Sequence, residues 1–215
     1  MTTPRTAPPN PASSGITGSR REELLAIAAD LFARRGFKNT TVRDIADAAG
    51  ILSGSLYHHF DSKEAMVDEI LSTFQSELFH RYDEIMASDA DARRKVEAVV
   101  EASFEAIDRH HAEVAIFQNE ATYLVEFERF DYLRSRNEQF RQLWMGLLGE
   151  GVSSGALRPD LDAELVFRFI RDTVWVAVRW YRPGGAMSAH DVAQQYLSIL
   201  LDGVAARPRP VEGKP

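Results

Sequence analysis

The sequence predicts an all-α protein of about nine helices, and three observations lead to this prediction. From residue 19 to residue 205, apolar side chains recur at the 3.6-residue spacing of a helix rather than in the alternation of a strand. Seven of the nine prolines lie in the two tails, where they do not interrupt a helix. Ser, Thr or Asp precedes several apolar runs, and glycine often follows them, as at the starts and ends of helices.

These signals place the helices in order. A Ser-x-x-Glu capping box at Ser19 begins the first helix, and Gly36 ends it. Thr41 is a good N-cap for the second helix, and Gly50 ends it. The third is expected over 53–60, the fourth from residue 62, and the others at roughly 91–109, 111–125, 130–150, 162–182 and 189–205. We therefore expect disordered tails at 1–18 and 206–215, a helical domain at 19–64 and a second one at 65–205.

The composition excludes several classes of protein. The 215-residue chain has no cysteine, so it has neither a disulfide framework nor a cysteine-ligated zinc site. No apolar run reaches the roughly 18 residues of a membrane-spanning helix, and the N-terminus lacks the layout of a secretory signal, so we expect a cytoplasmic protein. The net charge is −7, but residues 1–66 carry 8 Lys/Arg against 7 Asp/Glu, whereas residues 67–215 carry 17 against 25. The N-terminal third is therefore the part that can approach a polyanion.

The segment GILSGSLYHHFDSKE (50–64) joins the second and third helices through a short glycine-led turn. Two short helices joined in this way, braced by a longer helix before them, are typical of a helix-turn-helix motif, whose second helix enters the major groove of DNA. Ser53, Gly54 and Ser55 are small enough to bring that helix close to the DNA, while Leu56 and Phe60 are expected to face inward. A plain helical hairpin in a bundle is the alternative interpretation.

Two other interpretations of this segment have little support. His58 and His59 are neighbours and point about 100° apart on a helix, so they do not hold one metal ion together. Neither Ser53 nor Ser55 lies at the strand-to-helix turn that exposes a nucleophilic serine. No paired acid and base stands out elsewhere in the chain. We therefore expect no enzymatic activity, no metal and no cofactor.

The block TTVRDIADAAGILSGSLYHHFDSKEAMVDEIL resembles the DNA-binding domain of the TetR family of transcriptional regulators, over about residues 20–70. The resemblance implies a homodimer that binds an operator with two-fold symmetry and is released when a small molecule enters the C-terminal domain. It also implies that Thr41, Ser53, Tyr57 and Lys63 hold phosphates, and that Gly54, Ser55 and His58 face bases. His58 departs from the family pattern, in which an aromatic residue is frequent at this position.

The segment DAELVFRFIRDTVWVAVRWYRPGG (162–185) has two contrasting faces. One is an ordinary apolar stripe, and the other carries four arginines and an indole: Arg168, Arg171, Trp175, Arg179 and Arg182. Such a face suits a ligand with phosphates and an aromatic base, because guanidinium groups bind phosphates bidentately and an indole stacks on rings. Coenzyme A esters have this combination. The alternative is a solvated face, or a dimer seam crossed by ion pairs.

An apolar acyl group needs a pocket, and the second domain offers aromatic candidates for its wall: Phe104, Phe117, Tyr123, Phe140, Trp144 and Phe167. Most of these are expected to be ordinary core residues. Gln118 and Asn119 are polar residues in an apolar helix, and either is able to orient a carbonyl group. The residues that we expect to bind ligand are Arg168, Arg171, Trp175, Gln118, Trp144 and Phe117.

A closer resemblance concerns GILSGSLYHHF, SFEAI (103–107) and RFIRDTVWVAVRWYRPGG, which are similar to the TetR-type repressors of late cholesterol-ring catabolism in actinobacteria. It covers nearly the whole chain except the tails. It implies an effector that is a CoA thioester of a steroid-ring fragment, contacted by Arg171 and Trp175. We expect the dimer to form through helices 162–182 and 189–205. The alternatives are another apolar effector, such as a fatty acyl-CoA or a drug-like molecule, and a helical module that binds another protein.

Overall fold

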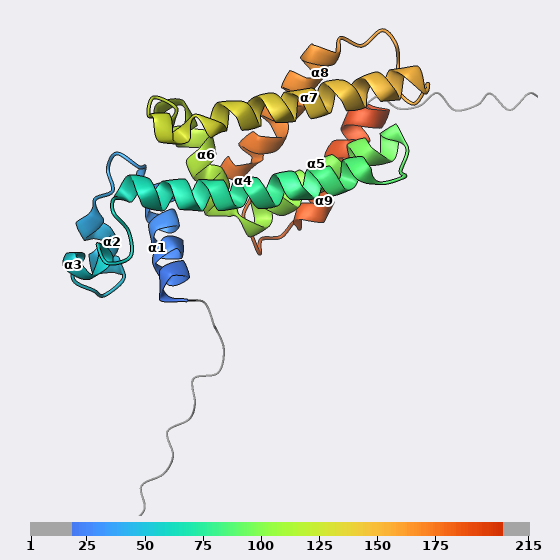
Figure 1. Ribbon diagram of the computed structural model, residues 1–215. Helices are drawn as coiled ribbons and strands as arrows, with labels where there is room; N and C mark the ends of the chain where they lie inside the picture. The colour runs from blue at the N-terminus through green and yellow to red at the C-terminus, as the bar shows by residue number, and fades with distance from the viewer. Residues whose placement is uncertain (1–18, 204–215) are drawn as a thin grey trace, which may run out of the picture.

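The computed structural model describes residues 19–203, and every secondary-structure element in that range is helical (Figure 1). The first domain contains α1 (Arg20–Arg35), α2 (Val42–Ala48) and α3 (Ser53–Leu56), which lead into α4 (Lys63–Ala87). The remaining elements are α5 (Ala92–Arg109), α6 (His111–Leu124), η1 (Glu128–Phe130), α7 (Tyr132–Ser153), α8 (Ala163–Val176), η2 (Ala177–Arg179), α9 (Ala189–Leu197) and η3 (Ser198–Asp202). The all-α prediction is confirmed. The predicted tails at 1–18 and 206–215 lie outside the described residues.

Side-chain caps explain where the first helices begin. The Ser19 hydroxyl accepts a hydrogen bond from the backbone N–H of Glu22, and the Glu22 carboxylate accepts one from the backbone N–H of Ser19. Thr41 and Asp44 form the same capping box at α2. At the end of α1, Gly36 has a φ of +83°, in the left-handed region where glycine has no steric penalty. The sequence predicts both of these helix starts correctly.

The third helix is shorter than predicted. Regular α-helix ends at Leu56 rather than near Phe60, and the chain continues through tight turns. In these turns the backbone N–H groups of His58 and His59 bond to carbonyl oxygens three residues back, at 3.3 and 2.9 Å. This tighter winding brings Phe60 into the core, where Leu56 and Phe60 are only 1% and 4% exposed. Both residues face inward, as the sequence predicts.

The helix predicted over 162–182 is interrupted as well. Helix α8 ends at Val176, and the 3-10 turn η2 follows it. Beyond η2, the Tyr181 hydroxyl donates a hydrogen bond of 2.6 Å to Asp108 of α5, and Pro183 prevents further helix. Arg179 and Arg182 are therefore exposed beyond the end of α8 and do not extend its arginine stripe. The segment predicted at 189–205 is likewise divided, into α9 and the π turn η3.

Two apolar cores hold the elements together. The larger core joins the second half of α4 to α5, α7, α8 and α9. The other core is built on α1, α2, the α3 segment and the start of α4, which lie together at one end of the molecule (Figure 1). This smaller core also includes Ile116 and Leu124 of α6 and Leu133 of α7. Helix α6 therefore packs directly against the helix-turn-helix domain.

Candidate DNA-binding surface and ligand cavity

Residues 53–60, here called the recognition segment, present an accessible surface. Gly54, Ser55 and His58 are exposed, Tyr57 is 54% exposed, and Ser53 is half-buried. A Cβ atom added at Gly54 would meet no other atom within 4 Å, so the backbone there is open to close approach. The structure therefore places five of the predicted DNA contacts on one short accessible segment.

Thr41 and Lys63, the other two predicted DNA contacts, are engaged within the protein. The Thr41 hydroxyl accepts a hydrogen bond from the backbone N–H of Asp44 at 3.1 Å. The Lys63 ammonium donates to the carbonyl oxygens of Phe37 (2.8 Å) and Thr40 (3.1 Å), and it lies 4.3 Å from the centroid of the Phe37 ring. Lys63 therefore ties the start of α4 to the α1–α2 loop, and one of its three N–H donors remains for a phosphate.

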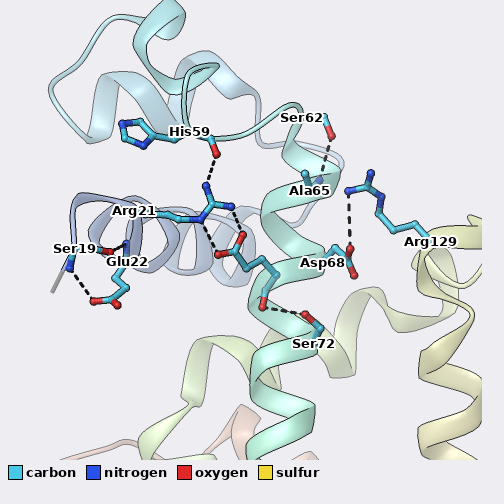
Figure 2. A network of polar contacts seen from close by, with 10 residues as sticks. Ser19, Arg21, Glu22, His59, Ser62, Ala65, Asp68, Ser72 and Arg129 are labelled. Carbon is cyan, nitrogen blue, oxygen red and sulfur yellow. Dashed lines mark hydrogen bonds and ion pairs between the residues drawn. The ribbon is translucent and has the colours of Figure 1, made fainter.

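Arg21 of α1 holds the recognition segment against α4 (Figure 2). Its guanidinium donates two hydrogen bonds to the Glu69 carboxylate, one of them 2.9 Å long, and a third to the backbone carbonyl of His59. It also lies 4.1 Å from the centroid of the Phe60 ring. The hydrogen bond to Glu69 is the main cause that raises the pKa of Arg21. Periodicity alone does not identify this residue, because Glu69 lies 48 positions away in the sequence.

Helix α6 makes a second connection to the helix-turn-helix domain. The Glu120 carboxylate accepts a hydrogen bond from the backbone N–H of Phe37 at 3.1 Å. The Lys38 ammonium lies 3.6 Å from the centroid of the Tyr123 ring. Both contacts hold the α1–α2 loop, which Lys63 also binds. Helix α6 is therefore joined directly to the loop that leads into α2.

A third connection joins α4 to the turn before α7. Asp68 lies 3.9 Å from the guanidinium of Arg129 in η1 (Figure 2). Burial raises the pKa of Asp68, and the charge of Arg129 opposes that rise. Glu69, the next residue, binds Arg21. Adjacent residues of α4 therefore contact different domains: Asp68 contacts the C-terminal domain, and Glu69 contacts the helix-turn-helix domain.

A cavity of about 610 Å³ lies between α4, α6, α7 and α8. Its wall is mainly apolar, with Phe74, Leu78 and Phe79 contributed by α4. Six residues that the sequence singles out also line it: Phe117, Gln118, Phe140, Phe167, Arg171 and Trp175. The four helices thus bring together residues that are up to about a hundred positions apart in the chain.

Trp144 and Arg168, which the sequence also predicts to bind ligand, do not line this cavity. Trp144 is 1% exposed and lies in the core, where its indole meets the Phe140 ring edge-on at 6.3 Å between centroids. Arg168 lies about 60° round α8 from Arg171, and it is turned to solvent beside Glu164, at 3.5 Å. Three other candidates also lie elsewhere: Phe104 packs on Tyr196, Tyr123 packs on Phe37, and Asn119 is exposed.

The cavity also has basic residues that the sequence pattern does not reveal. Arg134, Arg136 and Arg141 of α7 line it together with Arg171 of α8. All four are exposed or half-buried, so they form a rim rather than a floor. Arg141 forms an ion pair of 2.8 Å with one oxygen of the Glu164 carboxylate, and Arg168 lies 3.5 Å from the other oxygen. The rim is assembled from two helices, and no stripe on either helix alone indicates it.

The chemistry of the cavity is that of a binding site. Most of the polar groups that face it are guanidinium or amide groups, which bind anions and carbonyl oxygens. Within residues 19–203, no cluster of three or more His, Asp or Glu side chains is placed to hold a metal ion.

Over the same range, no helix is both long and apolar enough to cross a membrane.

Family models match both halves of the chain. Residues 24–70 match the model described as "Bacterial regulatory proteins, tetR family", and residues 89–204 match "Tetracyclin repressor-like, C-terminal domain". These two matches correspond to the helix-turn-helix domain with the start of α4, and to α5–η3 with the turn before them.

Individual relatives are similar over nearly the whole chain. The HTH-type transcriptional repressor KstR2 of Rhodococcus jostii (strain RHA1) is 62% identical over 201 residues, which cover 94% of this chain and 98% of that protein. KstR2 of Mycobacterium tuberculosis (strain CDC 1551 / Oshkosh) is 56% identical over 191 residues, which cover 89% and 96%. The solved structure of the ketosteroid transcriptional regulator KstR2 of Mycobacterium tuberculosis superposes with a TM-score of 0.85 at 55% identity, covering 91% of this chain and 100% of that one. Repressors of the TetR family bind operator DNA and a small-molecule effector, and they are not enzymes. These matches show that the chain belongs to the TetR family of transcriptional regulators.

Proposed function

We propose that this protein represses genes for the late steps of cholesterol-ring degradation, and that a CoA thioester of a steroid-ring fragment releases it from its operator. The observation that carries this proposal is the cavity, which combines an apolar wall with a rim of four arginines. The similarity to KstR2, a ketosteroid transcriptional regulator in Mycobacterium tuberculosis, supports a steroid-derived effector. Such a repressor acts in the cytoplasm, where its operator lies.

A CoA thioester suits both parts of the cavity. The volume of about 610 Å³ is within the roughly 300–1,000 Å³ of small-molecule sites, and its aromatic wall suits a fused-ring acyl group. The guanidinium groups of the rim suit the phosphates of CoA, because they bind phosphate oxygens bidentately. Arg171 and Trp175 lie one turn apart on α8 at the boundary between rim and wall. We assign to them the contact with the CoA part of the ligand.

The outer face of α8 supports a homodimer. Leu165, Phe169 and Val176 are 49%, 63% and 37% exposed, and Trp180 after η2 is 53% exposed. These residues follow one another at helical spacing, and exposed apolar patches of this kind mark protein–protein interfaces. Ile199 of η3 is a further exposed apolar residue, at 48%. We propose that this face and the α9–η3 segment pack against their copies in a second subunit.

In such a dimer the two recognition segments enter successive turns of the major groove. Gly54, Ser55 and His58 then face bases, while Ser53 and Tyr57 bond phosphates. The thioester changes the affinity for DNA only if it binds one spacing of the two segments better than another. Helix α6 supports that coupling, because it lines the cavity and also holds the α1–α2 loop through Glu120.

The test is a titration of DNA release, measured by fluorescence anisotropy on labelled DNA from the region upstream of the gene. The titrants are a CoA thioester of a steroid-ring acid, the matching free acid, and free CoA. Release by the thioester alone is the expected result, because only the thioester contacts both the apolar wall of the cavity and its arginine rim. Tight DNA binding that no thioester relieves would contradict the proposed ligand. An affinity for DNA that does not fall as salt rises would favour a protein-binding module instead.

A further inference from the structure

Gln75 of α4 is a buried polar residue within an apolar surface. Its neighbours on the same face, Leu71, Phe74 and Leu78, belong to the apolar cores, and Gln75 itself is only 3% exposed. It lines the cavity, on the wall made by α4. No group among residues 19–203 forms a hydrogen bond with its side-chain amide. The amide atoms are not completely enclosed by protein. The amide therefore has unsatisfied hydrogen-bonding capacity beside the cavity.

The Gln75 amide depends on whatever fills the cavity for its hydrogen bonds. A leucine or methionine at this position would extend the apolar stripe of α4 and need no partner. Large buried polar side chains are usually paired, and enclosing an amide without a hydrogen bond is unfavourable. A ligand that fills the cavity therefore either bonds to the Gln75 amide or loses affinity by leaving it unpaired.

The hydroxyl of Tyr82, one turn beyond Leu78, does not take this role. The Ser103 hydroxyl donates its hydrogen bond to the carbonyl of Val99 at 2.7 Å. Ser103 therefore accepts from the Tyr82 hydroxyl, at 2.7 Å, and the Tyr82 proton is already used. On the α4 wall, Gln75 is the polar side chain left to bond a ligand, and because it is neutral it suits an uncharged oxygen.

We propose that Gln75 is a specificity-determining residue, whose amide hydrogen-bonds to an uncharged oxygen on the ring part of the effector. This inference rests on the proposed function and narrows its ligand to acyl groups that carry a keto or hydroxyl oxygen away from the thioester. Plain fatty acyl and unoxygenated ring thioesters leave the amide unpaired. A site built to bond an oxygen rejects such analogues, because the polar group stays buried without a partner.

The experiment compares two CoA thioesters of one fused bicyclic propanoic acid, one with a ring ketone and one with a methylene in its place. Their affinities are measured by quenching of tryptophan fluorescence, since Trp175 lines the cavity, and in parallel by release of labelled DNA. The proteins are the parent, Gln75→Leu, Gln75→Met, and the control Gln142→Leu, which replaces an exposed glutamine of α7 outside the cavity. Two apolar variants are used so that an effect of side-chain shape is not mistaken for loss of the hydrogen bond.

The parent and Gln142→Leu should bind the keto thioester more tightly, by about 5- to 150-fold, the range expected when a buried partner is left unpaired. Both Gln75 variants should lose this preference and bind the methylene compound at least as well as the parent does. Their ligand-free melting temperatures should not fall, because the Gln75 amide makes no hydrogen bond to the rest of residues 19–203. A purely structural role for Gln75 predicts lower melting temperatures.

The possible failures are distinguishable. Equal affinity of the parent for the two thioesters, or an unchanged preference in the Gln75 variants, would overturn the role of Gln75 and leave the proposed CoA ligand in place. Absence of binding of either thioester to the parent would overturn both proposals. A keto preference that depends on Gln75 but is not accompanied by DNA release would support the role of Gln75 and contradict release as the mode of regulation.

Discussion

At the scale of single residues, the recognition segment depends on one arginine that does not belong to it. Arg21 lies in α1, yet it bonds the backbone carbonyl of His59 and the carboxylate of Glu69 at the same time. The position of the segment is therefore set from two sides, by Arg21 and by the burial of Leu56 and Phe60. The side chains of Tyr57 and His58 are exposed and therefore accessible to DNA.

Replacing Arg21 with methionine should weaken operator binding about fivefold, the effect of about 1 kcal/mol for a partly exposed arginine network. The affinity for the thioester should not change, since Arg21 lies outside the cavity. The control is Arg34→Met, which removes the same charge from the same helix but breaks only an exposed pair with Asp30. Equal losses in the two variants, measured by anisotropy, would mean that Arg21 acts only through its charge.

Replacing Tyr57 with alanine should weaken operator binding about tenfold, because a dimer loses one phosphate contact in each half-site. The melting temperature should stay close to that of the parent, since Tyr57 is 54% exposed and supports no core contact. Anisotropy and thermal denaturation by circular dichroism measure the two quantities. A large loss of stability with no specific loss of DNA affinity would assign Tyr57 to the fold instead.

At the scale of elements, α6 contacts both the cavity and the helix-turn-helix domain. Phe117, Gln118 and Ala121 line the cavity, whereas Glu120 and Tyr123 contact the α1–α2 loop. Ile116 and Leu124 anchor the same helix in the core of the helix-turn-helix domain. We therefore expect a ligand that displaces the cavity face of α6 to move the loop that carries Phe37.

Glu120→Leu should bind the thioester as the parent does but respond to it less, because the hydrogen bond from the Phe37 N–H is lost. The ratio of DNA affinities without and with ligand should fall about fivefold or more, within the usual range of coupling energies. Glu120→Gln keeps an oxygen acceptor and should retain most of the response. If Glu120→Leu kept the full ratio, the coupling would not pass through this contact.

The sequence predicts the order of the elements well because caps and apolar periodicity are local signals. Ser19, Thr41, Ser62 and Asp162 each cap a helix as expected. The errors lie where distant contacts form. Tight turns that bury Phe60 follow the short α3, and Tyr181 bonds to Asp108 of α5 just beyond η2. The same reason applies to the cavity. The sequence of α8 alone indicates Arg171 and Trp175. The rim arginines of α7 and the position of Gln75 on the cavity wall can be identified only from the packed arrangement of the helices.

At the scale of the whole molecule, the proposed regulation requires two subunits, because a single recognition segment has no second segment from which its spacing can change. The exposed apolar residues of α8 and η2 are the candidates for that interface. Changing Phe169 and Trp180 together to glutamate should give a monomer of about 24.1 kDa instead of a dimer of twice that mass in light scattering. Operator affinity should fall steeply while the thioester still binds. A dimer that survives both changes would place the interface elsewhere.

The most direct test of the account measures operator release by the keto thioester from the parent, from Arg171→Ala and from Arg168→Ala. Both variants lose one arginine of α8, but only Arg171 lines the cavity. All three proteins should bind DNA alike without ligand, and Arg171→Ala should need at least about tenfold more thioester for release, as expected for a lost charged hydrogen bond. Arg168→Ala should release like the parent. Identical release curves for all three would contradict the claim that a ligand in this cavity controls DNA binding.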